Sequence, residues 1–199
     1  HTPMGGVLTR LASKKVRGSG TRIIYTAHGF HFFKGAAIKN WLLYYSVEKL
    51  LSFYTDALIT INKEDYYRAK KSFNAGEIHY VPGVGVDVAK FANEKIDKKI
   101  KRKQLGISND SIVILSVGEL SKRKNHEVVI KALSKLNNLN IVYIICGQGD
   151  LINYLKKLAD ELNVEVKFLG FRNDISEIFS ISDLFVFPSF QEGLPVALM

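Results

Sequence analysis

The sequence has little cysteine and no long apolar run. Cys146 is the single cysteine among 199 residues, so the chain offers no disulfide framework and no cysteine metal site. No run approaches the roughly 18 apolar residues that a membrane-spanning helix requires. The first residues also lack the apolar core followed by small residues that marks a signal peptide. We therefore expect a cytoplasmic location and a buried, apolar role for Cys146.

The bulk composition is that of a globular protein with a basic surface. Hydrophobic residues make up 47% and charged residues 24% of the chain, which excludes disorder, and the net charge is +9. Such a charge favours nucleic acid, an anionic membrane or phosphate-bearing substrates. The densest basic run, residues 95–103, lacks the interleaved aromatic residues on which bases stack. We interpret it as a solvated helix face, with attraction to acidic lipids as the alternative, and expect no nucleic-acid partner.

From about residue 111 onward, short apolar runs alternate with helical patterns. Strands are predicted at Ile112–Leu115, Ile141–Cys146, Val164–Leu169 and Leu184–Phe187. Helices are predicted near Asn125–Leu136, Leu151–Leu162 and Asp174–Ser182, with apolar residues at i, i+3, i+4 and i+7. Strands that are apolar on both faces indicate a parallel sheet covered by helices on each side. The pattern from residue 111 onward therefore predicts βαβ units of a doubly wound α/β domain.

The first part of the chain repeats the pattern more briefly. Strands are predicted at Arg22–Thr26, Ala57–Ile61 and Ile78–Val81, and a heavily buried helix at Lys39–Leu51. The two patterns meet at Val81–Asp87, where a proline and two glycines interrupt the chain. We predict two domains, residues 1–84 and 85–199. Both look truncated, so we expect a piece of a longer protein.

The end of the chain has the pattern of an anion-binding turn. The residues Glu192, Gly193, Leu194 and Pro195 follow an apolar strand, and the proline stands where a helix would begin. Amides at a helix start have no partner within the helix, so Gly193 and Leu194 are candidates to hold an anion while Glu192 contacts hydroxyls. This pattern indicates a phosphorylated sugar as ligand.

Two glycine-containing loops follow predicted strands of the second half. After Gly118 come Lys122, Arg123 and Lys124, which are placed to hold a diphosphate at the strand ends. The alternative is an exposed loop whose lysines only maintain solubility. Gly147 and Gly149 permit close backbone approach to a ligand, and a tight turn explains them equally well. They are not part of a dinucleotide fingerprint, because the third glycine is absent.

A histidine ends the first predicted strand. His28 is followed by Gly29, a position where catalytic groups are commonly carried. A hydrogen-bonded structural histidine is the more frequent alternative. His28 and His31 have the spacing of a metal pair, but no nearby carboxylate or cysteine completes a site. We therefore expect no metal.

In this order, the motifs resemble those of retaining nucleotide-sugar glycosyltransferases of family 4. The sequence of residues 25–65 is most similar to that of bacterial capsule and exopolysaccharide transferases. The motifs that carry the resemblance span nearly the whole chain: His28, Val81–Asp87, Val117–Leu120 with Lys124, Gly147–Asp150, Phe168–Phe171, and Phe187–Ser189 with Glu192–Pro195.

The resemblance implies the GT-B fold, in which two Rossmann-like doubly wound domains face a cleft. It implies a nucleotide-sugar donor, a lipid-linked saccharide acceptor, a front-side displacement with retention, and no cofactor. His28 and Glu192 would act at the transferred sugar. The residues that would bind the donor are Gly118, Arg123, Lys124, Gly147, Gly149, Phe171, Arg172, Gly193 and Leu194.

The chain departs from the family pattern at two places. Glu119 stands where the family has arginine, so Lys122 or Arg123 is expected to compensate. The family's second glutamate would fall just after Met199, so we expect the ribose contact to be missing and this piece to be inactive by itself.

Other functions and a membrane contact stay open at this point. A nucleotide-sugar epimerase or a phosphorylase of the same fold is the enzyme alternative, and a noncatalytic protein that binds polyanions or membranes is the third. A peripheral contact with the inner face of the membrane is expected through basic residues of the first domain: Arg10, Lys14, Lys15, Arg17 and Arg22.

Overall fold

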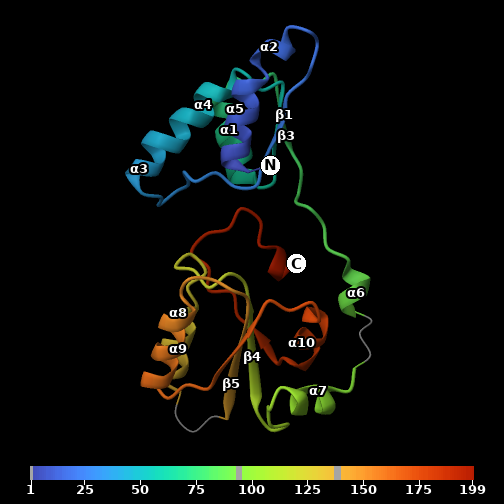
Figure 1. The fold of residues 1–199 in the computed structure, drawn as a ribbon, viewed down its shortest axis with the longest axis vertical. Helices are drawn as coiled ribbons and strands as arrows, with labels where there is room; N and C mark the ends of the chain where they lie inside the picture. The colour runs from blue at the N-terminus through green and yellow to red at the C-terminus, as the bar shows by residue number, and fades with distance from the viewer. Residues whose placement is uncertain (1, 93–95, 137–139) are drawn as a thin grey trace. The chain divides into compact units, whose positions relative to one another are not determined.

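The computed structural model describes residues 2–92, 96–136 and 140–199. Contacts divide this part of the chain into two compact units. The first contains the residues up to Gly85 together with Glu192–Val196, and the second contains Val86–Gln191 with Ala197–Met199. Each unit is an α/β structure around a parallel sheet (Figure 1). The predicted α/β class with parallel sheets is confirmed, whereas the domain limits 1–84 and 85–199 stay a prediction.

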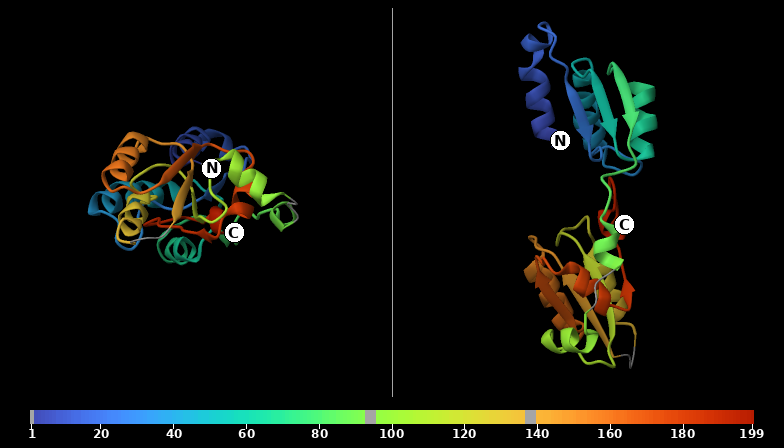
Figure 2. Two further views of the ribbon diagram at one scale, coloured as in Figure 1. Left: turned by 90° about the horizontal axis from the view of Figure 1, so that it is seen from below. Right: turned by 90° about the vertical axis from the view of Figure 1, so that its right-hand side faces the viewer.

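The sheet of the first unit has the order β1-β2-β3. Its strands are β1 (Ile24–Ala27), β2 (Ala57–Thr60) and β3 (Glu77–Tyr80), and the right-hand view of Figure 2 shows the three arrows pointing the same way. The helices are α1 (Pro3–Ala12), α2 (Lys14–Arg17), α3 (Ile38–Asn40), the π-helix η1 (Trp41–Tyr45), α4 (Ser46–Ser52) and α5 (Lys63–Ser72). The three strands predicted for the first half are confirmed.

The helical segment α3-η1-α4 is less buried than its sequence indicates. Trp41 and Tyr45 pack against the core of the first unit, and Leu51 is buried. Leu42 and Leu50, by contrast, are 71% and 63% exposed. The prediction of a heavily buried helix was therefore wrong, because only one of its two apolar faces meets the core.

Arg10 of the first unit is buried rather than placed on a membrane-facing surface. Its guanidinium donates to a carboxylate oxygen of Glu48 at 2.8 Å and lies 4.2 Å from the centroid of the Tyr25 ring. Arg17 forms an ion pair with Asp56 at 2.5 Å. Two of the five basic residues expected to attract lipid headgroups are thus engaged inside the unit. No helix in the described ranges is long and apolar enough to cross a membrane.

The second unit has a parallel sheet with the order β6-β5-β4-β7. Its strands are β4 (Ile112–Val117), β5 (Ile141–Cys146), β6 (Val166–Gly170) and β7 (Leu184–Phe185). Its helices are α6 (Val88–Ala92), α7 (Lys98–Gln104), α8 (His126–Leu133), α9 (Ile152–Glu161), α10 (Ile175–Ile181) and the short 3-10 helix η2 (Val196–Leu198). The strands and helices predicted from residue 111 to Phe187 are confirmed, with ends that differ by a few residues.

Two apolar cores lie on opposite faces of this sheet. Ile114 and Tyr143 point to the face covered by α8 and α9, whereas Leu115 and Ile144 point to the face covered by α10. Figure 1 shows α8 and α9 on one side of β4 and β5 and α10 with α7 on the other. Cys146 belongs to the second core and is buried, as expected. Burial on both faces explains why the strands are continuous apolar runs.

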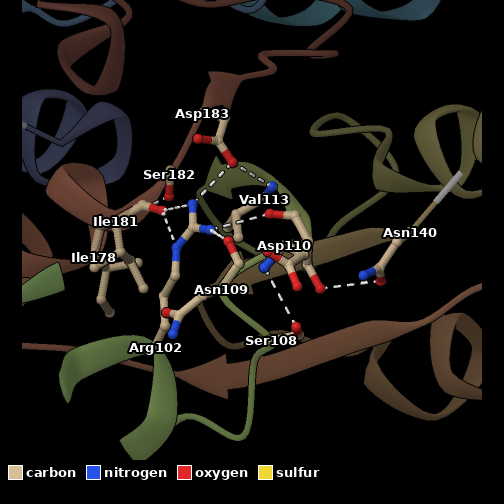
Figure 3. A network of polar contacts seen from close by, with 11 residues as sticks. Arg102, Ser108, Asn109, Asp110, Val113, Asn140, Ile178, Ile181, Ser182 and Asp183 are labelled. Atoms are coloured by element: carbon tan, nitrogen blue, oxygen red, sulfur yellow. Dashed lines mark hydrogen bonds and ion pairs between the residues drawn. The ribbon is translucent and has the colours of Figure 1, made fainter. Parts of the chain in front are cut away.

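The basic helix α7 is only in part the solvated helix face that its composition indicates: Lys98, Lys99 and Lys103 are exposed, whereas the Lys101 and Arg102 side chains are each 11% exposed. Arg102 donates to the carbonyl oxygens of Ile181, Asn109 and Ser111 and pairs with Asp183 at 2.9 Å (Figure 3). Its side chain is only 11% exposed. The interpretation of residues 95–103 is therefore wrong for this arginine, which holds α7 against the end of α10 and the start of β4; Lys95 itself lies outside the described residues.

Candidate functional site

Glycines lie at the carboxyl ends of three adjacent strands in the second unit. Gly118 follows β4, Gly147 follows β5, and Gly170 ends β6. The N–H of Gly147 donates to the Gly170 carbonyl at 2.8 Å, and a Cβ atom on Gly147 would lie 1.8 Å from the Gly118 oxygen. No side chain fits there. Close packing of the two strand ends therefore accounts for Gly147, and its role toward a donor stays a prediction.

Gly149 is required by the same loop packing. A Cβ atom on Gly149 would lie 2.6 Å from the carbonyl oxygen of Leu120. Leu120 in turn donates its N–H to Gln148 at 2.9 Å. The β5-α9 turn is thereby fixed against the β4-α8 loop. A close backbone contact within the protein accounts for this glycine, and its role toward a donor stays a prediction.

Lys124 folds back over the end of β4. A Cβ atom on Gly118 would lie 3.1 Å from Cε of Lys124, so the lysine stem occupies the space that Gly118 leaves open. The ammonium nitrogen lies 4.8 Å from the centroid of the Phe187 ring. Phe187 follows β7, which pairs with β4. The structure thus places a cation, oriented by an aromatic face, at the sheet edge where open α/β sheets bind ligands.

Arg123 joins the β4-α8 loop to the segment after β7. Its guanidinium donates to the carbonyl oxygen of Gln191 at 3.1 Å and lies 3.9 Å from the carboxylate of Glu119. Its own carbonyl accepts the N–H of Phe190 at 3.0 Å. Glu119, which replaces the family's arginine, is therefore next to a cation. The expected compensation by Arg123 at the donor stays a prediction.

Arg172 forms a bidentate ion pair within the second unit. Its Nε and Nη2 atoms donate to the two carboxylate oxygens of Asp174 at 2.8 and 2.6 Å. Asp174 also accepts from Lys101 at 2.6 Å, and the hydrogen bonds from Arg172 hold the pKa of Asp174 well below its ordinary value. The adjacent Phe171 ring is 74% exposed. Arg172 orders the β6-α10 turn, and Phe171 is the exposed group beside it.

Three buried polar residues under the β4-α8 loop were missed by sequence reasoning. His126 contacts the carbonyl oxygen of Glu119 at 3.3 Å and the Tyr143 hydroxyl at 3.2 Å. The Tyr143 hydroxyl donates to Ser116 at 2.8 Å, and Ser116 donates to the carbonyl oxygen of Val186 at 2.6 Å. Polar residues within otherwise apolar strands were the available signal, since each needs a buried hydrogen-bond partner.

Asn125 stands at the N-cap position of α8 but does not cap it by its side chain. Its backbone is left-handed, with φ of 54°, and its side-chain amide donates to the carbonyl oxygen of Pro188 at 3.3 Å. This hydrogen bond instead holds the segment after β7 against the loop that carries Lys124.

In the first unit, His28 directly follows β1 and is exposed. The loop after it is held by side chains from two helices. Asp65 accepts the N–H of Phe30 at 2.9 Å, Asn40 donates to the carbonyl of His31 at 3.0 Å, and Arg68 donates to the carbonyl of Phe32 at 3.0 Å. Burial raises the pKa of Asp65. His28 is therefore presented by a well-fixed loop, and its catalytic role stays a prediction.

The segment Glu192–Val196 is grouped with the first unit. A Cβ atom on Gly193 would lie 1.9 Å from the carbonyl oxygen of His28, and the side chain of Leu194 lies against Gly83. The helix predicted after Pro195 is a three-residue 3-10 helix, Val196–Leu198. A helix start after Pro195 is thus present as one turn of 3-10 helix. The donor contacts of Glu192, Gly193 and Leu194 stay predictions.

Among the residues that the structure describes, no group of three or more histidine, cysteine, aspartate and glutamate side chains is placed to hold a metal ion.

Comparison of sequences places these features in a family. Residues 97–199 match the family model "Glycosyl transferases group 1". The chain is 43% identical over 202 residues to EpsD of Bacillus subtilis (strain 168), which is named as a glycosyltransferase. It is 34% identical over 209 residues to the Escherichia coli UDP-Gal:alpha-D-GlcNAc-diphosphoundecaprenol alpha-1,3-galactosyltransferase. The alignments cover 98% and 100% of this chain, but 52% and 53% of the two relatives.

Solved structures agree on the fold. Anabaena HepE in complex with UDP and glucose superposes with a TM-score of 0.80 and 21% identity, over 98% of this chain and 53% of HepE. WaaG, a glycosyltransferase involved in lipopolysaccharide biosynthesis, superposes with a TM-score of 0.75 and 20% identity, over 94% of this chain and 58% of WaaG. The predicted GT-B type of fold is confirmed by these likenesses. The chain belongs to the group 1 glycosyl transferases.

Proposed function

We propose that this chain is part of a retaining, family 4 glycosyltransferase that moves a sugar from a nucleotide-sugar donor to a lipid-linked saccharide in bacterial cell-surface polysaccharide synthesis. Family membership supports the transferase activity. The printed name of the E. coli relative includes a UDP-sugar and a diphosphoundecaprenol acceptor, which supports the donor and acceptor classes.

The observation that carries the proposal is the position of Lys124. Its side chain lies across Gly118, with the ammonium group at the carboxyl edge of the sheet and above the Phe187 ring. When the bond between sugar and diphosphate breaks, negative charge develops on the departing diphosphate. A fixed ammonium group there stabilises the transition state more than the ground state.

The remaining roles follow from the family resemblance. His28 and Glu192 act at the transferred sugar, and Phe171 borders the nucleotide base. Neither a cofactor nor a metal is part of the proposal, because the lysine supplies the positive charge at the leaving group. A peripheral contact with the inner face of the membrane brings the enzyme to its lipid-linked acceptor. In the first unit, the exposed cations Lys14, Lys15 and Arg22 remain for this contact.

The test uses the full-length protein, a panel of nucleotide sugars and a lipid-linked saccharide acceptor. Lys124→Ala is expected to lower the transfer rate by at least about 100-fold, the size of effect seen when one charge-stabilising group is removed. Lys156→Ala is the control, because Lys156 is an exposed lysine of α9 outside this loop, and it should retain most activity. Glu192→Gln and His28→Ala test the roles at the sugar.

The products separate this function from its alternatives. A product with the donor's anomeric configuration supports retention, and an inverted product would contradict it. A donor sugar that changes without any acceptor would indicate an epimerase instead. A requirement for inorganic phosphate would indicate a phosphorylase. Unchanged transfer by Lys124→Ala would overturn the assignment of the donor site.

A further inference from the structure

A chain of four hydrogen bonds runs beneath the β4-α8 loop, between two backbone carbonyl oxygens. The carbonyl of Glu119 lies 3.3 Å from Nε2 of His126, and Nδ1 of the same ring lies 3.2 Å from the Tyr143 hydroxyl. Tyr143 then contacts Ser116 at 2.8 Å, and Ser116 contacts the carbonyl of Val186 at 2.6 Å. The three linking residues, His126, Tyr143 and Ser116, are 3%, 0% and 1% exposed, so the chain lies inside the unit.

This arrangement needs one proton more than its neutral side chains supply. Both ends are carbonyl oxygens, which only accept, so the four bonds require four protons. A neutral imidazole, a phenol and an alcohol provide one each, which is three. When His126 is protonated, both ring nitrogens donate, Tyr143 donates to Ser116, and Ser116 donates to Val186. Protonation of His126 therefore satisfies all four bonds, whereas a neutral ring leaves one unmade.

The surroundings of the ring oppose this protonation. Burial lowers the pKa of His126, the hydrogen bond to the Glu119 carbonyl raises it, and the positive charge of Lys124 lowers it further. Two further charged residues line the same cavity as His126: Lys122 on the loop, and Glu127 on α8, which pairs with Lys131. The apolar residues Leu151, just before α9, and Leu155 of α9 also line this cavity. Negative charge brought close to Lys124 by a bound anion would therefore oppose the effect of the lysine on the ring and favour protonation.

We propose that His126 is a positioning residue, and that it takes up a proton when a diphosphate binds at Lys124, thereby completing the buried network and fixing the loop from Gly118 to Lys124. The inference rests on the proposed function, because the diphosphate is that of the nucleotide donor. Since coupling between two ligands is reciprocal, a proton that binds with the diphosphate also strengthens its binding.

The test is calorimetric titration of the full-length protein with UDP, in buffers of different ionisation enthalpy at pH 6 and pH 8. The wild-type protein should take up more protons on binding than His126→Gln, with the protonation of UDP itself being common to both. Uptake of one additional proton corresponds to an affinity gain of up to about tenfold per pH unit. His126→Gln should lose this additional pH dependence.

Two further variants keep the histidine but shorten the network. In Tyr143→Phe, the bonds left are from His126 to Glu119 and from Ser116 to Val186, and neutral groups satisfy both. In Ser116→Ala, the remaining bonds are from His126 to the Glu119 carbonyl and between Tyr143 and His126. A neutral ring and the Tyr143 hydroxyl supply the two protons that these bonds need. Both variants should therefore lose the extra proton uptake.

Two control variants and an NMR titration complete the experiment. Tyr154→Phe and Ser134→Ala change the same residue types at sites outside the network, and both should behave like the wild-type protein. If a network variant fails to fold, NMR titration of the His126 ring in the wild-type protein gives the same information. The ring should protonate at a higher pH with UDP bound than without it.

The results distinguish this inference from the function on which it rests. Equal proton uptake by the wild-type protein and all three network variants, or an unchanged His126 titration with UDP bound, would overturn the inference and leave the proposed function standing. If the wild-type protein bound neither UDP nor any other nucleoside diphosphate at either pH, the proposed function would fail, and the inference with it.

Discussion

The ammonium nitrogen of Lys124 lies 4.8 Å from the centroid of the Phe187 ring, which joins the loop after β4 to the segment after β7. Nothing in the spacing of these residues, which are far apart in the chain, indicates this contact. It follows from the parallel pairing of β4 with β7, which brings the ends of both strands to the same edge. The ring thereby orients the cation on which the proposed chemistry depends.

Phe187→Leu is expected to weaken UDP binding by the full-length protein about two- to fivefold. The substitution removes a cation-π contact of about 0.5–1 kcal/mol, while a large apolar side chain remains. Isothermal titration calorimetry measures the change. Phe190→Leu serves as the control, because that ring is 75% exposed. An equal loss of affinity in both variants would mean that Phe187 does not orient Lys124.

Gly147→Ala is expected to lower the free energy of unfolding by about 1–3 kcal/mol, the usual cost of overpacking, and to reduce UDP binding. The new methyl group would lie 1.8 Å from the Gly118 carbonyl oxygen, so the two strand ends must separate. Gly18→Ala is the control, since its Cβ atom would lie 3.5 Å from the nearest atom. If urea unfolding gave Gly147→Ala the same free energy of unfolding as the wild-type protein, the close packing of Gly147 against Gly118 would be contradicted.

Asp174→Asn should destabilise the protein near neutral pH by an amount on the order of 1–3 kcal/mol, because the variant loses charged hydrogen bonds to Arg172 and Lys101. The pKa of Asp174 is lowered in the folded state by Arg172. Its contribution is therefore present above the ordinary pKa of an aspartate and is lost as the pH falls below it.

Urea unfolding at pH 6 and pH 3 tests this dependence. The difference in stability between the wild-type protein and Asp174→Asn should be larger at pH 6. Asp160→Asn, at an exposed position of α9, should leave stability nearly unchanged at both values. If the difference in stability between the wild-type protein and Asp174→Asn were larger at pH 3 than at pH 6, the assigned direction of the pKa shift would be contradicted.

Arg10→Met is expected to lower stability by about 3–5 kcal/mol, because it leaves the buried carboxylate of Glu48 without its cation. Adding Glu48→Leu should restore much of the loss, since an apolar pair of similar volume replaces the ion pair. Thermal unfolding measures both effects. Lys14→Met, at an exposed position, is the control. If Arg10→Met alone unfolded at the same temperature as the wild-type protein, the ion pair between Arg10 and Glu48 would not be required for stability.

Much of the fold was predictable because burial on both faces produces continuous apolar strands. The runs Ile112–Leu115 and Ile141–Cys146 indicated a parallel sheet, and glycines marked the ends of its strands. Helix amphipathicity supplied the rest of the second unit. These features are local in sequence, so periodicity and turn residues reveal them.

The features that sequence reasoning missed depend on contacts between distant segments. Arg10 and Arg102 have the sequence context of solvated cations, but each meets its partners only after the chain has folded. The His126, Tyr143 and Ser116 network likewise joins residues from one helix and two strands. By contrast, the helix start after Pro195 depends on local sequence, and the structure has a helical turn there, Val196–Leu198.

The measurement that tests the central claim most directly is a crystal structure of the full-length protein with UDP bound. The diphosphate is predicted to lie at the carboxyl edge of β4 and β5, with an oxygen within hydrogen-bonding distance of Lys124 Nζ and with the backbone of Gly118 and Gly147 beside it. A UDP molecule bound elsewhere, with Lys124 still folded over an empty edge, would contradict the account.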